Sequence, residues 1–310
     1  REAASQWLQP LKIRSMIRVS ASQTKAALAA ARGGQLCRGF SSASEITTAF
    51  KYCRTQVQRY DHDSYLWCLL LPKDVQAATF CLRAFNVETA LVADASKELP
   101  IQQMRMMWWR EAVSAVFSGG ADPIPDHPVA KALAFLSSQR PLSRYWLQRI
   151  ISARESDIEA TGPPGSMADL EAYTEGTHSA LLYLQLEAAS VKHKSADHAA
   201  SHLGKAHGIS TLLRGTAHHA AARRCYIPSE LLAKHKVSEE MIYKGKSNEV
   251  LKDAVHEVAG EAKLHLDQAR LLAKDLPKEA TQLMLGAVGC KLYLEALQVC
   301  GFREMYIVLH

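Results

Sequence analysis

From residue 45 onward the chain carries the hydrophobic spacing of α-helices almost without interruption. Apolar residues recur three and four positions apart, and no stretch of useful length alternates between apolar and polar residues as a half-buried strand does. Proline and glycine stand between the periodic stretches, where they separate helices from one another. The sequence therefore predicts one all-α domain, a single large helical bundle, over residues 45–302.

Two of the expected helices are apolar around most of their circumference. They lie in VQAATFCLRAFNVETALVA (75–93) and THSALLYLQLEAASV (177–191). Such helices sit in the middle of a bundle rather than on its rim, and a large bundle can enclose a cavity between its central helices. The full set of expected helices is 45–60, 73–95, 101–118, 127–138, 142–160, 168–190, 195–222, 248–274 and 278–299, with a loop carrying short helical turns at 228–247.

The first 44 residues differ in composition from the rest of the chain. They contain seven lysines and arginines and one acid, and this excess equals the whole net charge of +6. A segment rich in Ala, Ser and Arg and almost free of acids is typical of a mitochondrial transit peptide, which we expect at 1–44. The remainder is near neutral and has no basic stripe with interleaved aromatics, so nucleic acid is not an expected partner. Residues 303–310 are expected to form a short C-terminal tail.

The apolar side chains are expected to serve packing rather than chemistry. Seven cysteines are scattered and none forms a CxxC pair, which favours reduced, buried thiols over a disulfide framework or a zinc site. Trp108 and Trp109 are expected to supply a large buried area. No uninterrupted apolar run reaches the about 20 residues that a membrane-spanning helix needs.

Six stretches that occur in a fixed order carry a resemblance to a known family. Together they resemble the squalene/phytoene synthase family across about 50–300, and within it a divergent mitochondrial branch of complex I assembly proteins. The resemblance implies the helical fold of isoprenoid synthases, but a fold does not by itself fix an activity. The stretches are YDHDSYLWCLLLP (60–72), FCLRAFNVETALVAD (80–94), MRMMWWREAV (104–113), ARESDIEA (153–160), YTEGTHSALLYLQLEA (173–188) and GKAHGISTLLRGTAHHAAARRCYIP (204–228).

The resemblance implies a specific chemistry for the active members of the family. They join two isoprenoid diphosphates, and magnesium ions neutralise the leaving diphosphate. Two pairs of aspartates at i, i+4 hold the metal ions from facing helices, because that spacing puts both carboxylates on one helical face. The residues that match the first pair are Ala90 and Asp94, and those that match the second pair are Gly215 and His219.

Three of the four implied carboxylates are therefore replaced in this chain. Glu88 is nearby, but two residues before Ala90 it lies about 200° around the helix from that face. A lone Asp94 would hold magnesium poorly. The sequence therefore predicts a non-catalytic protein with no catalytic residue, no bound metal and no cofactor.

Four polar residues are candidates for lining a cavity: Arg154, Asp157, Tyr173 and Arg214. Tyr173 matches a position that lines the family's cavity, although we favour a core tyrosine with a hydrogen-bonded hydroxyl. Arg154 and Asp157 stand at i, i+3, so an intrahelical ion pair is the alternative to a role in the cavity. A buried charged pair can be functional or merely structural, and the sequence leaves both interpretations open.

Six histidines between 193 and 219 offer an alternative set of metal ligands. His198 and His202 stand at i, i+4, a spacing that can bind zinc from one helical face, and His219 could add a third ligand. No HExxH motif is present, and no cysteine or acid at zinc spacing completes the set. We therefore favour a solvated polar face, or core histidines bonded to the backbone, over a zinc site.

Three functions remain open from the sequence. The one that we favour is a non-catalytic assembly factor for mitochondrial respiratory complex I (NADH:ubiquinone oxidoreductase), acting early at the matrix face of the inner membrane. The partners that the resemblance implies are complex I subunits or assembly intermediates, peripheral contact with the inner membrane, and an apolar, lipid-like ligand. The alternatives are an active isoprenoid diphosphate transferase with altered metal ligands, and a lipid or isoprenoid carrier unrelated to complex I.

Overall fold

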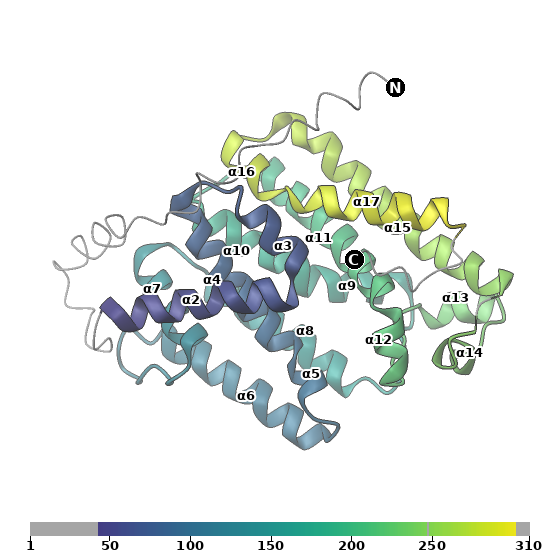
Figure 1. Ribbon diagram of the computed structural model, residues 1–310, viewed down its shortest axis with the longest axis horizontal. Coiled ribbons are helices and arrows are strands. Elements are labelled where there is room, and N and C mark those ends of the chain that lie inside the picture. Colours follow the sequence, from purple (N-terminus) through teal and green to yellow (C-terminus); the bar gives the residue numbers. More distant parts are fainter. Residues whose placement is uncertain (1–42, 247, 302–310) are drawn as a thin grey trace.

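The computed structural model describes residues 43–246 and 248–301, and in these ranges it contains helices, turns and loops but no strand. The helices surround a buried centre (Figure 1), so the all-α prediction is confirmed. The expected leader, 1–44, lies outside the described residues apart from its last two, which belong to the first described helix. The expected tail, 303–310, lies wholly outside them.

The described helices follow one another along the chain with short connections. They are α2 (Ala43–Tyr60), α3 (His62–Cys68), α4 (Lys73–Ala90), α5 (Val92–Ala95), α6 (Leu99–Val116), α7 (Pro128–Gln139), α8 (Arg144–Glu159), α9 (Met167–Thr174), the π-helical turn η4 (Glu175–Ser179), α10 (Ala180–Ala188), α11 (Lys194–Arg214), α12 (Thr216–Ala221), α13 (Ser229–Lys234), α14 (Glu239–Tyr243), α15 (Glu249–Leu272), the 3-10 turn η5 (Ala273–Asp275), α16 (Lys278–Leu283) and α17 (Gly286–Val299).

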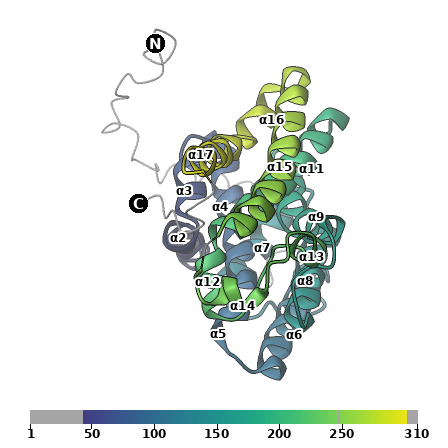
Figure 2. The ribbon, with the colours of Figure 1, turned by 90° about the vertical axis from the view of Figure 1, so that its right-hand side faces the viewer.

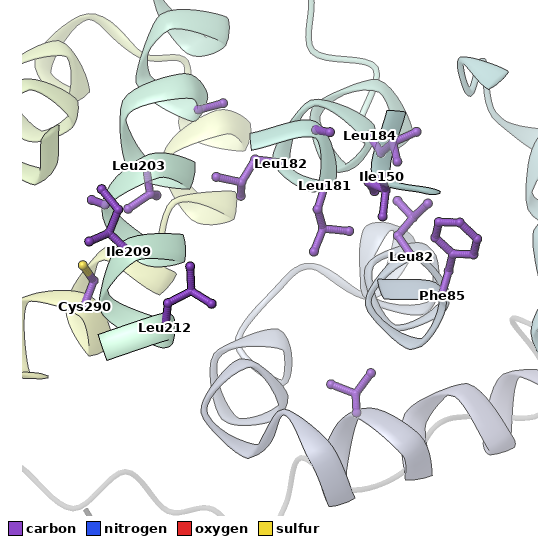
Figure 3. Packing of buried hydrophobic residues seen from close by; sticks show 14 of the residues in the cluster. Leu82, Phe85, Ile150, Leu181, Leu182, Leu184, Leu203, Ile209, Leu212 and Cys290 are labelled. Carbon is purple, nitrogen blue, oxygen red and sulfur yellow. The ribbon is translucent and has the colours of Figure 1, made fainter. Parts of the chain in front are cut away.

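The centre of the bundle is built from α4, α10 and α11. α4 packs against α2, α7 and α10, while α11 packs against η4, α10 and, along much of its length, α15 (Figure 2). Leu82 and Phe85 of α4 gather with Ile150 of α8 and Leu184 of α10 in one apolar cluster (Figure 3). Burying a side chain of this size stabilises a fold by about 1.5–3 kcal/mol, so these contacts dominate the stability of the bundle.

The two segments that the sequence places in the middle of the bundle are central in the structure. α4 is buried on almost all sides, and so is α10. The prediction from their all-round apolar character is therefore confirmed. These helices form the apolar wall behind the polar residues described below.

Glycines let α11 pack tightly against the π-helical turn. A Cβ atom at Gly204 would lie 2.4 Å from Cα of Ser179, and one at Gly208 would lie 2.7 Å from Cβ of Thr174. Real side chains do not approach so closely, so glycine is what allows the two backbones to come together. This crossing holds the segment that carries Tyr173 against α11.

The structure adds a helix and several breaks to the predicted set. α3 is seven residues long; it buries Trp67 on one side and exposes His62, Asp63 and Leu66 on the other. A helix of this length is shorter than the stretch over which a helical period can be recognised, so periodicity does not reveal it. The expected helix 73–95 is interrupted at Leu91, and the expected helix 195–222 is interrupted at Gly215.

The packing predictions hold with one exception. In the described residues the cysteines are free thiols, all buried except the partly exposed Cys300, which confirms the prediction for them. Trp109 is buried as expected, but Trp108 is 37% exposed, because it stands edge-on to Trp109 and His127 at the rim of the bundle. Over 43–246 and 248–301, every helix is too short or too polar to cross a membrane.

Candidate functional site

The two motif segments meet at one end of the bundle, where α5 lies beside α12 (Figure 1). Oδ1 of Asp94 in α5 lies 3.2 Å from Nε2 of His218 in α12, and both side chains are largely exposed. Ala90 is the last residue of α4, and Gly215 separates α11 from α12. The fold thus brings together the segments that the family resemblance assigns to metal binding. The contact with Asp94 is made by His218, which lies next to the matching position, His219.

His219 packs into the space beside Gly215. Its ring stands edge-on to Tyr226 with the centroids 4.7 Å apart. Burial, together with the neighbouring His218 and Arg224, lowers the pKa of His219 to about 4, so its imidazole is neutral at neutral pH. A Cβ atom at Gly215 would lie 2.8 Å from Nε2 of His219. A carboxylate-bearing residue at 215 would therefore have to displace this ring.

The donors at the four motif positions do not fit magnesium. Mg²⁺ takes oxygen ligands, mainly carboxylates, water and substrate phosphates, and these positions supply one carboxylate, Asp94, which already contacts His218. In the part of the chain that the structure describes, no group of three or more His, Cys, Asp or Glu side chains is placed to hold a metal ion. His202 faces His265 of α15, with 2.8 Å between their Nδ1 atoms, instead of pairing with His198.

Asp157 of α8 anchors the segment that follows α12. Its carboxylate accepts a hydrogen bond from Nη2 of Arg224 and another from the hydroxyl of Tyr226 at 3.0 Å. Arg224 also donates to the backbone carbonyl of Asp157 at 3.3 Å. Burial raises the pKa of Tyr226 well above its ordinary value, so its hydroxyl remains a donor. Asp157 is therefore a structural acceptor that ties 224–226 to α8.

Arg154 does not pair with Asp157, so the intrahelical ion pair that the sequence left open does not form. Nη2 of Arg154 donates instead to Oδ1 of Asn86 in α4 at 2.7 Å. The side chains separate because Asp157 accepts from two donors in the segment after α12, Arg224 and Tyr226, whereas Arg154 turns toward α4. The residue is 8% exposed, and its Nε has no acceptor within the described residues.

Tyr173 lies at the junction of these groups. Its ring stacks on Tyr226 with the centroids 6.1 Å apart, and burial raises the pKa of its hydroxyl to about 12. The side chain is partly buried against the core and lines a cleft, and its hydroxyl donates to no protein acceptor across residues 43–246 and 248–301.

The cleft has a volume of about 470 Å³ and opens between α8 and α9. The loop 160–164, the segment 223–226 and Tyr243 complete its wall, and Asp157 and Tyr173 both contribute to the lining. Asp157 and Tyr173 are two of the four residues named from the sequence as candidates for lining a cavity. The rest of the wall was not predicted, although small residues along one face of α8 are a signal for it: Ser152, Ala153 and Ser156.

Arg214 lies away from the cleft. Its Nη1 is 2.5 Å from Oδ2 of Asp63, so it joins the end of α11 to α3. The four candidate cavity residues therefore do not form one group. Asp157 and Tyr173 meet at the cleft, Arg154 is buried behind them, and Arg214 serves another contact.

A cluster of polar side chains in the interior, between α3, α4 and α11, was not predicted from the sequence. Arg83 donates to Asp61 at 2.9 Å and to Ser64 at 2.6 Å, and its guanidinium lies 4.5 Å from the ring of Trp67. His207 lies nearby, and its pKa is lowered to about 4, chiefly by burial and then by the charge of Arg83. Polar residues thus occupy part of the interior in which the resemblance implies an apolar cavity.

Comparison with known proteins matches the fold and the family. The model of the squalene/phytoene synthase family matches residues 57–305. A solved squalene synthase from Alicyclobacillus acidocaldarius superposes with a TM-score of 0.72 over 84% of this chain and 97% of that chain, at 18% identity. A dehydrosqualene synthase crystallised with a ligand also gives a TM-score of 0.72, over 85% of this chain and 89% of its own.

Curated relatives add a narrower grouping. NADH dehydrogenase (ubiquinone) complex I, assembly factor 6, of Rattus norvegicus is 39% identical over 84% of this chain and 78% of its own length. The protein of the same name from Homo sapiens is 36% identical over 81% of this chain and 74% of its own. Presqualene diphosphate synthase of Rhodopseudomonas palustris is 26% identical over 54% of this chain and 58% of its own. The chain therefore belongs to the squalene/phytoene synthase family, and within it to the branch that contains the complex I assembly factor 6 proteins.

Proposed function

We propose that this protein is a non-catalytic assembly factor for respiratory complex I, built on the helical scaffold of a prenyl synthase. The observation that carries the proposal is the similarity to proteins named complex I assembly factor 6, at 36–39% identity over more than four fifths of the chain. The similarity to a presqualene diphosphate synthase is lower and covers about half of the chain. Its partners are then complex I subunits or assembly intermediates.

The donor set at the motif positions supports the absence of prenyl transfer. Release of a diphosphate from an allylic carbon needs positive charge held at the leaving oxygen atoms. Ala90 and Gly215 offer no ligand, and His219 is a half-buried imidazole packed on Tyr226. Asp94 is the single carboxylate left at these positions, and it contacts His218.

We infer that the protein works in mitochondria, at the matrix face of the inner membrane and early in assembly. The composition of residues 1–44 supports a mitochondrial address. Exposed apolar side chains on α3, on the turn that follows it and on α17 support peripheral contact with a membrane: Leu66, Leu70, Val288 and Leu292 are each more than half exposed. The two helices pack against each other along one edge of the bundle (Figure 2). The apolar, lipid-like ligand stays a prediction of the resemblance.

A rescue experiment tests the proposal. Cells from which the gene has been deleted would receive the wild-type protein or the Asp94→Asn variant, and complex I activity would be measured together with the abundance of the introduced protein. We expect both proteins to restore complex I equally, because Asp94 is exposed and does no chemistry. Asp157→Ala is the matched carboxylate control, and we expect it to lower abundance and rescue together because it removes a structural anchor.

Two results would contradict the proposal in different ways. If the wild-type protein failed to restore complex I, the assembly role would be wrong. If Asp94→Asn accumulated normally but did not rescue, the remaining carboxylate would have a chemical role. Purified protein incubated with an isoprenoid diphosphate and Mg²⁺ would then be assayed for diphosphate release, which the active-transferase alternative requires.

A further inference from the structure

One side of α6 exposes large apolar side chains to solvent. The helix runs along an edge of the bundle and packs against α8, α7 and α5 (Figure 1). Its packed side is enclosed, with Met106 and Trp109 both buried. On the other side Met104 and Met107 are 57% and 54% exposed, and Trp108 is 37% exposed. We call Met104, Met107 and Trp108 the Met–Trp face. Methionine and tryptophan are enriched at protein interfaces, so this face is a candidate contact surface.

Trp108 is held in place before any partner binds. Its ring stands edge-on to Trp109 with the centroids 4.9 Å apart, and edge-on to His127 with the centroids 5.5 Å apart. A side chain that is already ordered loses little entropy on binding, and tryptophan is among the residues that carry most of the energy of an interface. Trp108 is therefore a preformed anchor within the Met–Trp face.

Two exposed charges flank Trp108. Arg105 stands three residues before it and Glu111 three residues after it, and neither side chain forms an ion pair or hydrogen bond with a described residue. Arg110, by contrast, pairs with Glu155 of α8. Three residues turn a helix by about 300°, so the two charges lie on opposite sides of Trp108, each about 60° around the helix from it.

A surface with this pattern is complementary to itself. A two-fold axis that passes beside Trp108, at right angles to the line between the two charges, places Arg105 of each copy against Glu111 of the other. The apolar side chains then meet between two identical ion pairs. Complementary charges of this kind fix the register of an interface and disfavour other partners. The charge pattern therefore fits a second copy of this chain.

The position of α6 argues against a lipid surface as the occupant. In both views α6 lies on the side of the bundle away from α17 (Figures 1 and 2). A membrane that contacts α3 and α17 does not reach the Met–Trp face at the same time. This step alone rests on the function proposed above.

We propose that the protein forms a two-fold homodimer through α6, in which the Met–Trp faces pack together and Arg105 of each copy pairs with Glu111 of the other. A stable interface buries about 800 Å² of each partner, which is more than three partly exposed side chains supply. The dimer is therefore weak, with a dissociation constant of about 10–100 µM. It goes beyond the assembly function and forms without complex I.

Sedimentation velocity of the purified full chain tests the proposal. The protein would be measured from about 1 µM to about 300 µM, a range that spans the expected dissociation constant. We expect the wild type to shift from monomer to dimer over this range. Met107→Glu should remain monomeric, because it places a charge in the apolar contact. Leu271→Glu is the matched control, since Leu271 is 65% exposed on α15, and it should dimerise like the wild type.

A charge exchange tests the register of the dimer. Arg105→Glu and Glu111→Arg should each weaken dimerisation about tenfold, because each turns both ion pairs into like-charge contacts. An equimolar mixture of the two variants should dimerise at least as tightly as the wild type, since every contact in the mixed dimer again joins opposite charges. Recovery in the mixture also shows that the two variants are folded.

Three results would overturn the proposal: a wild type that stays monomeric up to the highest concentration, an equal loss of dimer in Met107→Glu and Leu271→Glu, or no recovery in the mixture. Vesicles of phosphatidylcholine and cardiolipin test the lipid alternative. Met107→Glu should sediment with them as the wild type does, and a loss of vesicle binding in this variant would assign the Met–Trp face to the membrane instead. None of these results depends on complex I, so a failure here leaves the outcome of the rescue experiment unchanged.

Discussion

Two polar contacts attach the end of the α11–α12 segment to the rest of the bundle, and they differ in burial. The inner contact joins Asp157 to Arg224 and Tyr226, and its carboxylate is 17% exposed. The outer contact joins Asp94 to His218, whose side chains are 46% and 64% exposed. Exposed ion pairs contribute about 0–1 kcal/mol, whereas breaking a buried pair costs about 3–5 kcal/mol.

This difference in burial shows how the α11–α12 segment is held in place without the carboxylates that the family resemblance assigns to metal binding. The outer contact occupies the motif region that the family resemblance assigns to metal, and it adds little to stability. The inner contact and the glycine-mediated crossing at Gly204 hold the segment in place. The fold therefore does not require carboxylates at 90, 215 or 219.

The largest expected loss of stability comes from breaking the inner contact. Asp157→Ala should lower the free energy of unfolding by about 2–3 kcal/mol, because it leaves Arg224 without its carboxylate and Tyr226 without its acceptor. The value is below that for a fully buried pair, since the side chain of Arg224 is partly exposed. Equilibrium unfolding in urea measures it, and a loss under about 0.5 kcal/mol would show that the two contacts do not differ as argued.

Lowering the pH should also destabilise the protein, through His219, which packs on Tyr226 of the inner contact. The pKa of His219 is lowered to about 4 in the folded protein, below the ordinary value of about 6.5. The neutral ring therefore contributes stability that is complete above about pH 6.5 and falls as the pH drops toward 4, by about 2 kcal/mol at pH 5. Urea unfolding at pH 7 and pH 5 should show that the free energy of unfolding falls less between these pH values for His219→Gln than for the wild type.

His218→Gln is the control for this pH dependence. His218 is exposed on the same short helix, so its variant should lose as much stability between pH 7 and pH 5 as the wild type does. If His218→Gln instead removed the pH dependence, the outer contact would be the titrating one.

A smaller effect is expected from the hydroxyl of Tyr226 alone. Tyr226→Phe removes the 3.0 Å hydrogen bond to Asp157 but keeps the ring against His219 and Tyr173. The free energy of unfolding should fall by about 1 kcal/mol. A loss as large as that of Asp157→Ala would mean that the tyrosine, rather than Arg224, carries the inner contact.

The fold could be predicted from the sequence because helical period and burial are local properties. The all-round apolar segments became α4 and α10, and Glu88, which helical geometry turns away from the motif face, accepts a hydrogen bond from Tyr52 of α2. α3 escaped prediction because its seven residues are too few to show a helical period. Its exposed Leu66 would be expected in a core from composition alone.

The site could be predicted only in part, because its contacts join residues far apart in the chain. The spacing of Arg154 and Asp157 allows them to pair, but their partners come from α4 and from the segment after α12. Nothing in the local pattern shows that Tyr226, and not Tyr173, will donate to the carboxylate of Asp157. The identities of the motif residues were readable from the sequence, whereas the cleft depends on how α8 and α9 pack.

The smallest expected change in stability comes from removing the outer contact, and it tests whether that contact is dispensable. Asp94→Ala should change the free energy of unfolding by less than about 0.5 kcal/mol, and the coupling to His218→Ala in a double-mutant cycle should fall further in high salt. The same cycle would be repeated with Mg²⁺. If Mg²⁺ stabilised the wild type and Asp94→Ala removed that stabilisation, the outer contact would be a metal site in use, and the contrast between a structural inner contact and a dispensable outer one would fail.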